Sequence, residues 1–356
     1  MTIAGNKGEW SEIYAFLRLL ADGKLHAADE HLNRMSNMHF PIIKIMREDS
    51  RSKCEYRPIV ERGEVEIYLN GRGVLKLPSS DFDAEASRLL GGMTNGKGSS
   101  FEFPETETFI RNIHINKLKA PAQDKSDIYM EIHDIHTGFD DTVGFSIKSR
   151  IGGLSTLLNA GNTTNFIYRV EGLDRDLIDE INSIKTLRKF KDRMKAITSN
   201  GGKLIFHSME NETFRENLRM IDGQMPEMVA TMLVGHYTDA STNCTDLSEY
   251  LSHIDPLERS KKNYEHNIKE MLCDIALGMK PATEWNGIDE ATGGYIVVKS
   301  DGDVLAYHIY NRDRFKNYLF ANTKFDSGSE KRYGHCALYE EEGELLIKLN
   351  LQIRFI

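Results

Sequence analysis

The hydrophobic positions near the start of the chain repeat with helical spacing. The apolar residues three or four positions apart are Trp10, Ile13, Phe16, Leu17 and Leu20, and Gly23 follows them. Residues at this spacing lie on one face of an α-helix, and glycine commonly ends a helix. The pattern therefore predicts an amphipathic helix over residues 8–21.

Short apolar and alternating runs then predict mainly extended structure over residues 39–78. The strand-like runs cover residues 40–46, 64–69 and 73–77, and the turn sequence LNGRG joins the last two. Apolar positions with helical spacing return near residues 81–91 and 104–112, where we expect two more helices.

Two further strand-like runs predict a β-hairpin over residues 126–150. The runs are SDIYMEIHDIH and TVGFSIKSRI, and Asp140 lies in the Gly- and Asp-containing segment between them. Glycine and aspartate are common in turns. With the turn centred near Asp140, Asp134 lies opposite Ser146, and alternation of side chains places Asp134, Ser146 and Lys148 on related faces.

The remainder of the chain is divided by local pattern. A loop rich in Gly, Asn and Thr is predicted over residues 151–166. We expect an N-terminal region, 1–172, with the hairpin and this loop; a mainly helical region, 173–281; and a β-rich C-terminal region, 282–356.

Composition is that of an ordinary folded protein. The chain has 356 residues, of which 40% are hydrophobic and 28% charged, close to the globular average. No apolar run approaches the roughly 20 residues that span a bilayer, and the start lacks a signal segment, so we expect a cytoplasmic protein without a membrane anchor. The four cysteines form no Cys-x-x-Cys pair, which argues against a zinc knuckle and a disulfide framework.

Charge alone argues mildly against a nucleic-acid partner. The net charge is −9, and phosphate binding depends largely on Lys and Arg. Net charge is a property of the whole surface, however, and a site-specific nuclease needs a basic cleft and not a basic exterior. The local distribution of Lys and Arg must therefore decide whether the chain can bind nucleic acid.

The predicted hairpin holds the candidate chemistry. Asp134 follows an apolar stripe, where a carboxylate is costly unless a cation compensates it. A carboxylate and a lysine on neighbouring strands suit phosphodiester hydrolysis: Asp134 would hold Mg²⁺ with the backbone carbonyl of Ile147, and Lys148 would orient the attacking water and stabilise developing charge. The same two charges also occur in hairpins as an ordinary cross-strand ion pair.

These residues resemble the active-site motif of the PD-(D/E)XK nuclease superfamily. The match is Asp134 followed by Ser146-Ile147-Lys148, with Ser146 where the family usually has an acid. The resemblance therefore requires a second acid from another element. KGEWSE at the start is similar to the opening helix of archaeal Holliday-junction resolvases, which favours Glu12. Glu9 is the next choice, although acids in a first helical turn also stabilise the helix dipole. Glu171 is a weaker choice.

Over nearly its whole length the chain resembles the HpaII family of type II restriction endonucleases. The similar segments are GNKGEWSEIYAFLRLLADGKL, GFSIKS with STLLNAGNTTNF, and LIKLNLQIRF. The resemblance implies an α/β fold: a PD-(D/E)XK-type restriction endonuclease core with a central mixed sheet, a helical insertion and a β-rich C-terminal segment. It also implies Mg²⁺-dependent cleavage of double-stranded DNA at CCGG with 5′-phosphate ends, a homodimer that reads symmetric half-sites, and a cognate DNA methyltransferase.

Reading G·C pairs requires donors to guanine and acceptors for cytosine. The candidates that follow the hairpin are Arg150, Asn159, Asn162, Thr163 and Asn165. The basic run 185–195, which includes Arg188 and Lys189, is a candidate for phosphate contacts. Turn chemistry in the loop and a solvated helix face in the basic run are the structural alternatives.

Three other functions stay open at this point. One is a structure-selective or repair nuclease of the same superfamily. The second is a DNA-binding protein that has lost catalysis, which the serine at position 146 makes conceivable. The third is a protein without a nucleic-acid role, for which the acidic net charge is the main argument.

Overall fold

The computed structural model describes the chain except for residues 1, 49–51, 120–125, 136–137 and 154. Long-range contacts divide it into two compact units. Unit 1 comprises Met1–Ser155 and Asp289–Phe315, and unit 2 comprises Thr156–Ile288 and Lys316–Ile356. The regions predicted with boundaries at 172 and 281 are continuous stretches of sequence. Each unit of the structure instead combines two segments that are distant in the sequence.

A nine-stranded sheet forms the centre of unit 1. Its strands are β2 (Lys24–Ala28), β3 (Arg34–Glu48), β4 (Lys53–Ile59), β5 (Glu64–Leu69), β6 (Arg72–Pro78), β8 (Ile128–His133), β9 (Asp140–Ser149), β13 (Gly294–Val298) and β14 (Val304–His308). The order is β2-β14-β13-β9-β8-β3-β4-β5-β6, with a further pairing of β2 to β3. Strands β9 and β13 are parallel, as are β14 and β2, while the other pairs are antiparallel. The predicted central mixed sheet is confirmed.

Helix α1 (Lys7–Asp22) begins and ends as its sequence predicts. The Asn6 side chain accepts from the backbone N–H of Glu9, and the Glu9 carboxylate accepts from the backbone N–H of Asn6, which forms a capping box. Gly23 ends the helix with φ of +64°, a conformation that favours glycine. Two more predicted helices are confirmed as α2 (Ser79–Asn95) and α3 (Pro104–Asn112).

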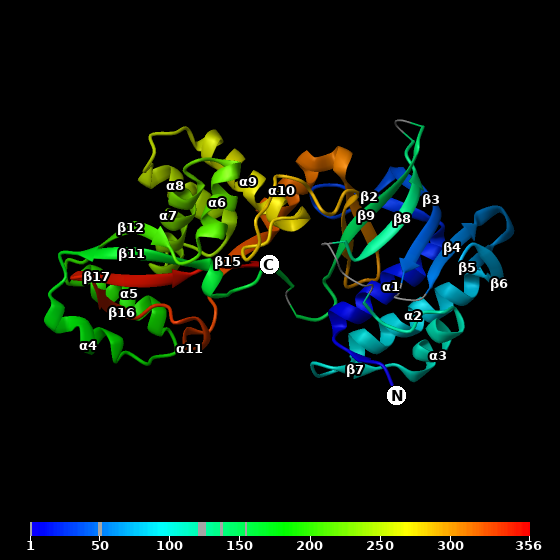
Figure 1. Cartoon of the computed structure of the whole chain (residues 1–356), viewed down its shortest axis with the longest axis horizontal. Helices are drawn as coiled ribbons and strands as arrows, with labels where there is room; N and C mark the ends of the chain where they lie inside the picture. The colour runs from blue at the N-terminus through cyan, green and yellow to red at the C-terminus, as the bar shows by residue number, and fades with distance from the viewer. Residues whose placement is uncertain (1, 49–51, 120–125, 136–137, 154) are drawn as a thin grey trace. The chain divides into compact units, whose positions relative to one another are not determined.

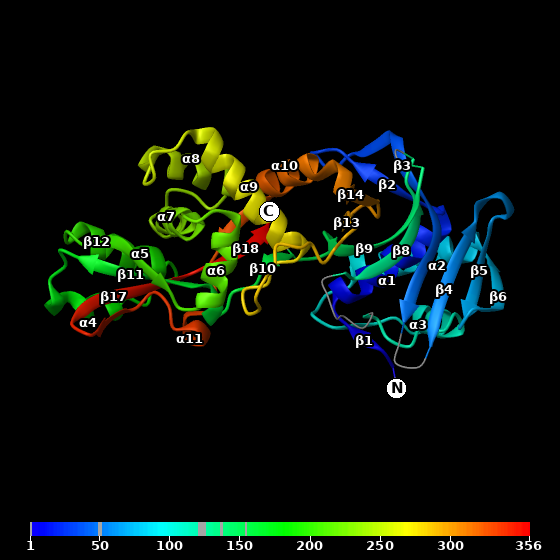
Figure 2. The ribbon, with the colours of Figure 1, turned by 45° about the horizontal axis from the view of Figure 1, so that its top comes forward.

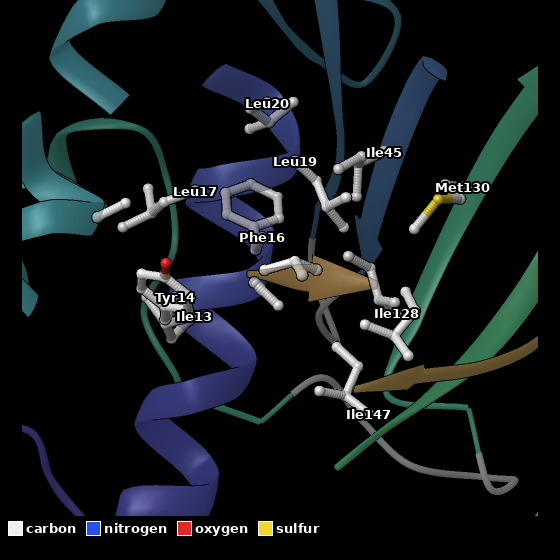
Figure 3. Close-up of a cluster of buried hydrophobic side chains, with 14 of the residues drawn as sticks. Ile13, Tyr14, Phe16, Leu17, Leu19, Leu20, Ile45, Ile128, Met130 and Ile147 are labelled. Atoms are coloured by element: carbon white, nitrogen blue, oxygen red, sulfur yellow. The ribbon is translucent and has the colours of Figure 1, made fainter. Parts of the chain in front are cut away.

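The core of unit 1 lies between α1 and the sheet (Figures 1 and 2). Phe16 and Leu19 of α1 face Ile45, Ile128 and Ile147 of the sheet (Figure 3), and all five are buried. Each such side chain contributes roughly 1.5–3 kcal/mol when it is fully buried. This packing fixes α1 against β9, the strand that carries Ser146 and Lys148.

Unit 2 contains two smaller antiparallel sheets and most of the helices. One sheet has the order β12-β11-β17-β16 and the other β10-β18-β15. The strands are β10 (Thr156–Leu158), β11 (Asn165–Glu171), β12 (Lys203–Met209), β15 (Thr323–Asp326), β16 (Leu338–Glu341), β17 (Glu344–Asn350) and β18 (Gln352–Phe355). The helices are α4 (Ile178–Asn182), α5 (Lys189–Ser199), α6 (Glu212–Ile221), α7 (Met225–Tyr237), α8 (Cys244–Ile254), α9 (Lys261–Leu277) and α11 (Glu330–Tyr333), and α10 (Arg312–Asn322) begins in unit 1.

The mainly helical middle and the β-rich C-terminal segment are confirmed, although strand β12 in the former and helix α10 in the latter were not predicted. Strand β12 interrupts the helices and pairs with β11. Within the described part of the chain, no helix is both long and apolar enough to cross a membrane.

Candidate active site

Strands β8 and β9 form the predicted hairpin, but their register differs from the prediction. His133 pairs with Asp140, and Ile128 pairs with Phe145. Asp140 therefore belongs to β9 and not to the turn. Its carboxylate lies 2.8 Å from the His133 imidazole. The sequence interpretation counted Asp140 as a turn residue because aspartate is common in turns, and this displaced the predicted register.

Asp134 consequently lies at the turn end of the hairpin. Its backbone N–H donates to the Phe139 carbonyl (2.9 Å), and its own carbonyl accepts from Gly138 (2.7 Å). The predicted placement of Asp134 opposite Ser146 is wrong. The side chain is buried, with 2% exposure, as expected for a carboxylate that continues an apolar stripe. After burial itself, the charge of Asp134 is the largest cause that raises the pKa of the Tyr310 phenol.

Asp127 occupies the place beside Ser146 that the sequence interpretation gave to Asp134. It lies one residue before β8, and its backbone N–H donates to the Phe145 carbonyl (2.9 Å). One carboxylate oxygen, Oδ2, accepts from the backbone N–H of Ile147 (2.6 Å) and from the Ser146 hydroxyl (3.3 Å). These bonds hold a carboxylate against the Ser146-Ile147-Lys148 segment.

Glu12 is the second carboxylate of this group. Burial and, to a smaller extent, the nearby charge of Asp127 raise its pKa to about 8. The pKa of Glu12 is lowered by the nearby positive charges of Lys119, Arg47 and Lys148. A buried acid next to a second acid is held protonated unless a cation compensates both charges. The charges of Asp127 and Lys148 therefore both act on Glu12, which makes these three residues a candidate site.

The three candidate second acids have different surroundings. The Glu9 carboxylate completes the capping box of α1 and lies 3.5 Å from the Lys119 ammonium. Glu171 is exposed and pairs with Arg169 in unit 2 (2.8 Å). Glu12 has a pKa raised by burial and by the charge of Asp127. Glu12 is therefore the acid that the structure brings together with Asp127 and Lys148.

The backbone N–H and carbonyl of Ile147 in β9 point to the side of the strand where Asp127 lies. The Gly144 carbonyl and the Arg150 N–H bond to the β13 side of the strand (2.7 and 2.8 Å). Along a strand, the N–H and C=O groups of successive residues point alternately to one edge and the other. The N–H and C=O of Ile147 therefore point toward the β8 side. The β8 pairing ends opposite Phe145, and the Ile147 N–H bonds to Asp127. The Ile147 carbonyl therefore points to the side of the Asp127 carboxylate.

Two cations that the sequence interpretation missed lie near Glu12. The Arg47 guanidinium donates to the carbonyls of Lys117 (3.1 Å) and Leu118 (2.9 Å), which fixes the segment before Lys119. Arg47 and Lys119 both lower the pKa of Glu12. Arg47 follows the apolar run of β3, and a charge at the end of such a run was the signal available in the sequence.

The donor set suits a small hard cation. Asp127 and Glu12 supply carboxylate oxygens, and Ile147 supplies a carbonyl on the same side of β9. Among the residues that the structure describes, no three His, Cys, Asp or Glu side chains form a metal-binding group. Carboxylate and backbone carbonyl oxygens are the ligands that hard divalent cations prefer. Burial and Asp127 raise the pKa of Glu12, and a bound cation would compensate both acids and lower that pKa again.

The predicted DNA-binding residues after the hairpin fall into different environments. Arg150 follows β9 in unit 1 and is half-buried. Asn159 and Asn162 are exposed in unit 2, and Thr163 is half-buried beside Asn162 in the short helix η2 (Asn162–Thr164). Asn159, Asn162 and Thr163 lie close together in sequence on one loop.

Asn165 is fully buried, and its side chain bonds within unit 2. The amide N–H groups donate to Glu210 (2.6 Å) and to the Tyr333 carbonyl (2.8 Å), and its oxygen accepts from Asn350 (2.7 Å). An asparagine with these bonds has no donor left for a base edge. The structure therefore places Asn165 in the support of the loop and not at its surface.

The basic run over 185–195 is largely neutralised by ion pairs. Arg188 and Lys191 both pair with Asp239, and Lys189 pairs with Glu330. Arg193 is buried and also binds Glu330. Several cations that the sequence analysis assigned to phosphate contacts therefore stabilise the fold through ion pairs.

Comparison with known proteins gives a consistent result. The family model described as "HpaII restriction endonuclease" matches residues 6–355. The chain is 38% identical, over 99% of both chains, to "Type II restriction enzyme HpaII" of Haemophilus parainfluenzae. No solved structure matches the chain.

Proposed function

The chain belongs to the HpaII restriction endonuclease family, and on this basis we propose that it cuts double-stranded DNA at the palindrome CCGG with Mg²⁺ as cofactor. Members of this family are type II restriction endonucleases, so the chain is a site-specific enzyme that hydrolyses DNA. The observation in the fold that carries the magnesium assignment is the half-buried pair of acids, Glu12 and Asp127, with the charge of Lys148 also acting on Glu12.

We propose that unit 1 has the PD-(D/E)XK type of active site with a changed set of residues. Asp127 replaces Asp134 as the first acid, because Asp127 bonds directly to Ser146 and Ile147. Ser146 stands at the position of the usual second acid, and Glu12 of α1 supplies the missing carboxylate. Lys148 is the lysine of the motif.

Asp127, Glu12 and the Ile147 carbonyl would hold the ion. Bound there, Mg²⁺ supplies Lewis-acid stabilisation of the charge that develops on the phosphate. The Ser146 hydroxyl donates to Asp127, which orients that carboxylate. The positive charge of Lys148 orients a water molecule and stabilises the pentacovalent transition state. Hydrolysis then joins the water oxygen to phosphorus and breaks the bond to the 3′-oxygen, which leaves a 5′-phosphate and a 3′-hydroxyl.

A palindromic target also implies partners. Two copies of the chain related by twofold symmetry would each read one half-site, so we propose that the active form is a homodimer. A DNA methyltransferase that modifies the same site would protect the host DNA. We propose that the enzyme acts in the cytoplasm, where this DNA lies.

Cleavage of unmethylated plasmid, with and without Mg²⁺, tests the proposal directly. We expect discrete fragments only with Mg²⁺, with ends that map to CCGG. Lys148→Ala should lower the cleavage rate by about 10²–10³-fold or more and leave DNA binding largely intact. Lys97→Ala is the matched control, because Lys97 is an exposed lysine of unit 1.

Two outcomes would contradict this function, and a third would contradict only the active-site assignment. Cutting confined to branched or damaged DNA would favour a structure-selective nuclease. Stable binding in Mg²⁺ without nicking would favour a DNA-binding protein that has lost catalysis. Near-normal cleavage by Lys148→Ala would reject the active-site assignment while leaving the restriction activity in place.

A further inference from the structure

Two loops of unit 2 that are far apart in the sequence are joined by one buried side chain. Asn350, at the end of β17, is completely buried. Its amide group donates to the Gly161 carbonyl (2.9 Å) and to the Thr164 hydroxyl (3.2 Å), and its oxygen accepts from the Gly328 N–H (3.2 Å). We refer to residues 159–164 and 327–334 as the paired loops.

A second buried amide joins the same two loops. Asn165 donates to the Tyr333 carbonyl (2.8 Å) and to Glu210 (2.6 Å), and Glu210 in turn pairs with Lys348 (3.2 Å). Buried polar groups are costly unless they are hydrogen-bonded. A network of this kind stabilises one arrangement of the paired loops.

Gly328 shows how closely the paired loops approach each other. A Cβ atom at this position would lie 2.6 Å from the Ala160 Cβ and 2.7 Å from the Tyr333 ring. Such distances are too short for any side chain, so only glycine permits this contact. The His335 ring lies against the same residue, with Nε2 3.0 Å from the Gly328 carbonyl.

The short helix α11, within the second loop, is anchored by its first residue. Glu330 pairs with Lys189 and, at 2.6 Å, with the buried guanidinium of Arg193. Arg193 also donates to the carbonyls of Asn182 (2.9 Å) and Cys336 (2.8 Å). The cations of the basic run therefore hold α11 in place.

The next two residues of α11 are cations directed outward. Lys331 and Arg332 are both exposed. In the part of the chain that the structure describes, neither forms an ion pair, unlike Arg188, Lys189 and Arg193. Asn162, on the other loop, is exposed as well. A chain with a net charge of −9 thus presents an ammonium, a guanidinium and an amide on two loops that buried hydrogen bonds join.

We propose that the paired loops are a DNA-contacting surface on which Lys331 and Arg332 bind the duplex together with Asn162. Guanidinium groups bind guanine edges, amides bind base edges, and ammonium groups bind phosphates. Loops supported by a rigid scaffold are a common place for binding residues. This inference rests on the proposed function and adds a specificity element that the basic run 185–195 does not supply.

DNA binding by the Lys331→Ala/Arg332→Ala variant tests the inference. Binding to a CCGG duplex is measured with Ca²⁺ in place of Mg²⁺ at several salt concentrations. We expect affinity to fall about tenfold or more and the slope of log K against log salt to lose about one unit for each lost phosphate contact. The single variant Arg332→Ala should lower the preference for CCGG over unrelated DNA, because a lost base contact affects only the specific complex.

Lys262→Ala is the matched control, since Lys262 is an exposed lysine on α9 of unit 2. Thermal unfolding should be unchanged in all of these variants because the substituted side chains are exposed. If the double variant binds with wild-type affinity and salt slope while the wild type cuts CCGG, the inference is overturned and the proposed function stands. If the wild-type protein neither binds nor cuts CCGG, the proposed function fails.

Discussion

Metal binding by this protein should release a proton from Glu12. Without metal, burial and Asp127 hold the pKa of Glu12 at about 8, compared with an ordinary value of 4.5. At pH 7 a group with this pKa is about 90% protonated, so binding of Mg²⁺ to its carboxylate should release about 0.9 proton. The apparent affinity for Mg²⁺ should rise about tenfold for each pH unit up to pH 8 and then level off.

The same acid should make the stability of the metal-free protein fall as pH rises. Because the pKa is raised in the folded state, the folded protein binds more protons than the unfolded chain between pH 4.5 and about 8. The contribution of Glu12 to the free energy of unfolding is complete below pH 4.5 and is lost as the pH rises through about 8. At ~1.4 kcal/mol per pH unit, the full effect is at most roughly 5 kcal/mol.

Titration calorimetry in two buffers of different ionisation enthalpy measures the released proton, and thermal unfolding from pH 5 to 9 measures the stability. Glu12→Gln should abolish the proton release, flatten the pH dependence between pH 5 and 8, and lower cleavage strongly. Glu9→Gln is the control, because glutamine also completes a capping box. If the wild-type protein releases no proton on binding Mg²⁺ at pH 7, Glu12 is not a metal ligand, and the placement of the second acid is refuted.

Four other substitutions extend the test, and each has its own readout. Asp127→Asn should lower the cleavage rate in Mg²⁺ by about 10²-fold or more, whereas Asp134→Asn should affect thermal stability more than cleavage; the reverse order of cleavage rates would restore Asp134 as the metal-binding acid. Ser146→Ala should slow cleavage only modestly and lower stability by about 0.5–1.5 kcal/mol in denaturant titrations, because one hydrogen bond to Asp127 is lost. Phe16→Ala should cost about 3–5 kcal/mol of unfolding free energy in the same titrations, since Phe16 is fully buried between α1 and the sheet; a loss below 1 kcal/mol would contradict this packing.

Local pattern was sufficient for most of the elements. The helical spacing that begins at Trp10 and the glycine at 23 predicted α1 closely, because a helix depends on neighbours within one or two turns. Strand β12 was missed because it lies in a mainly helical region and is stabilised by pairing with β11.

The register of the hairpin was the step at which local pattern failed. Alternation shows which residues share a face, but a shift of the turn moves every cross-strand neighbour. The sequence interpretation placed the turn at Asp140, whereas Gly138 and Asp134 form it, and this exchanged Asp127 for Asp134 beside Ser146. The shift in register did not affect the prediction for Lys148, because Lys148 lies on the same strand as Ser146.

The sequence by itself determined the chemical types, the order of the elements and the resemblance to a restriction endonuclease family. Only the tertiary structure decided which acids meet. Glu12 and Asp127 are more than a hundred positions apart, and the charge of Asp127 acts on Glu12 because α1 packs its apolar face against the sheet that contains β9. Asn165 and the basic run likewise became supports of a loop surface only through contacts with Asn350 and Glu330. Periodicity specifies a face of an element, whereas a site requires distances between elements, and only packing determines those distances.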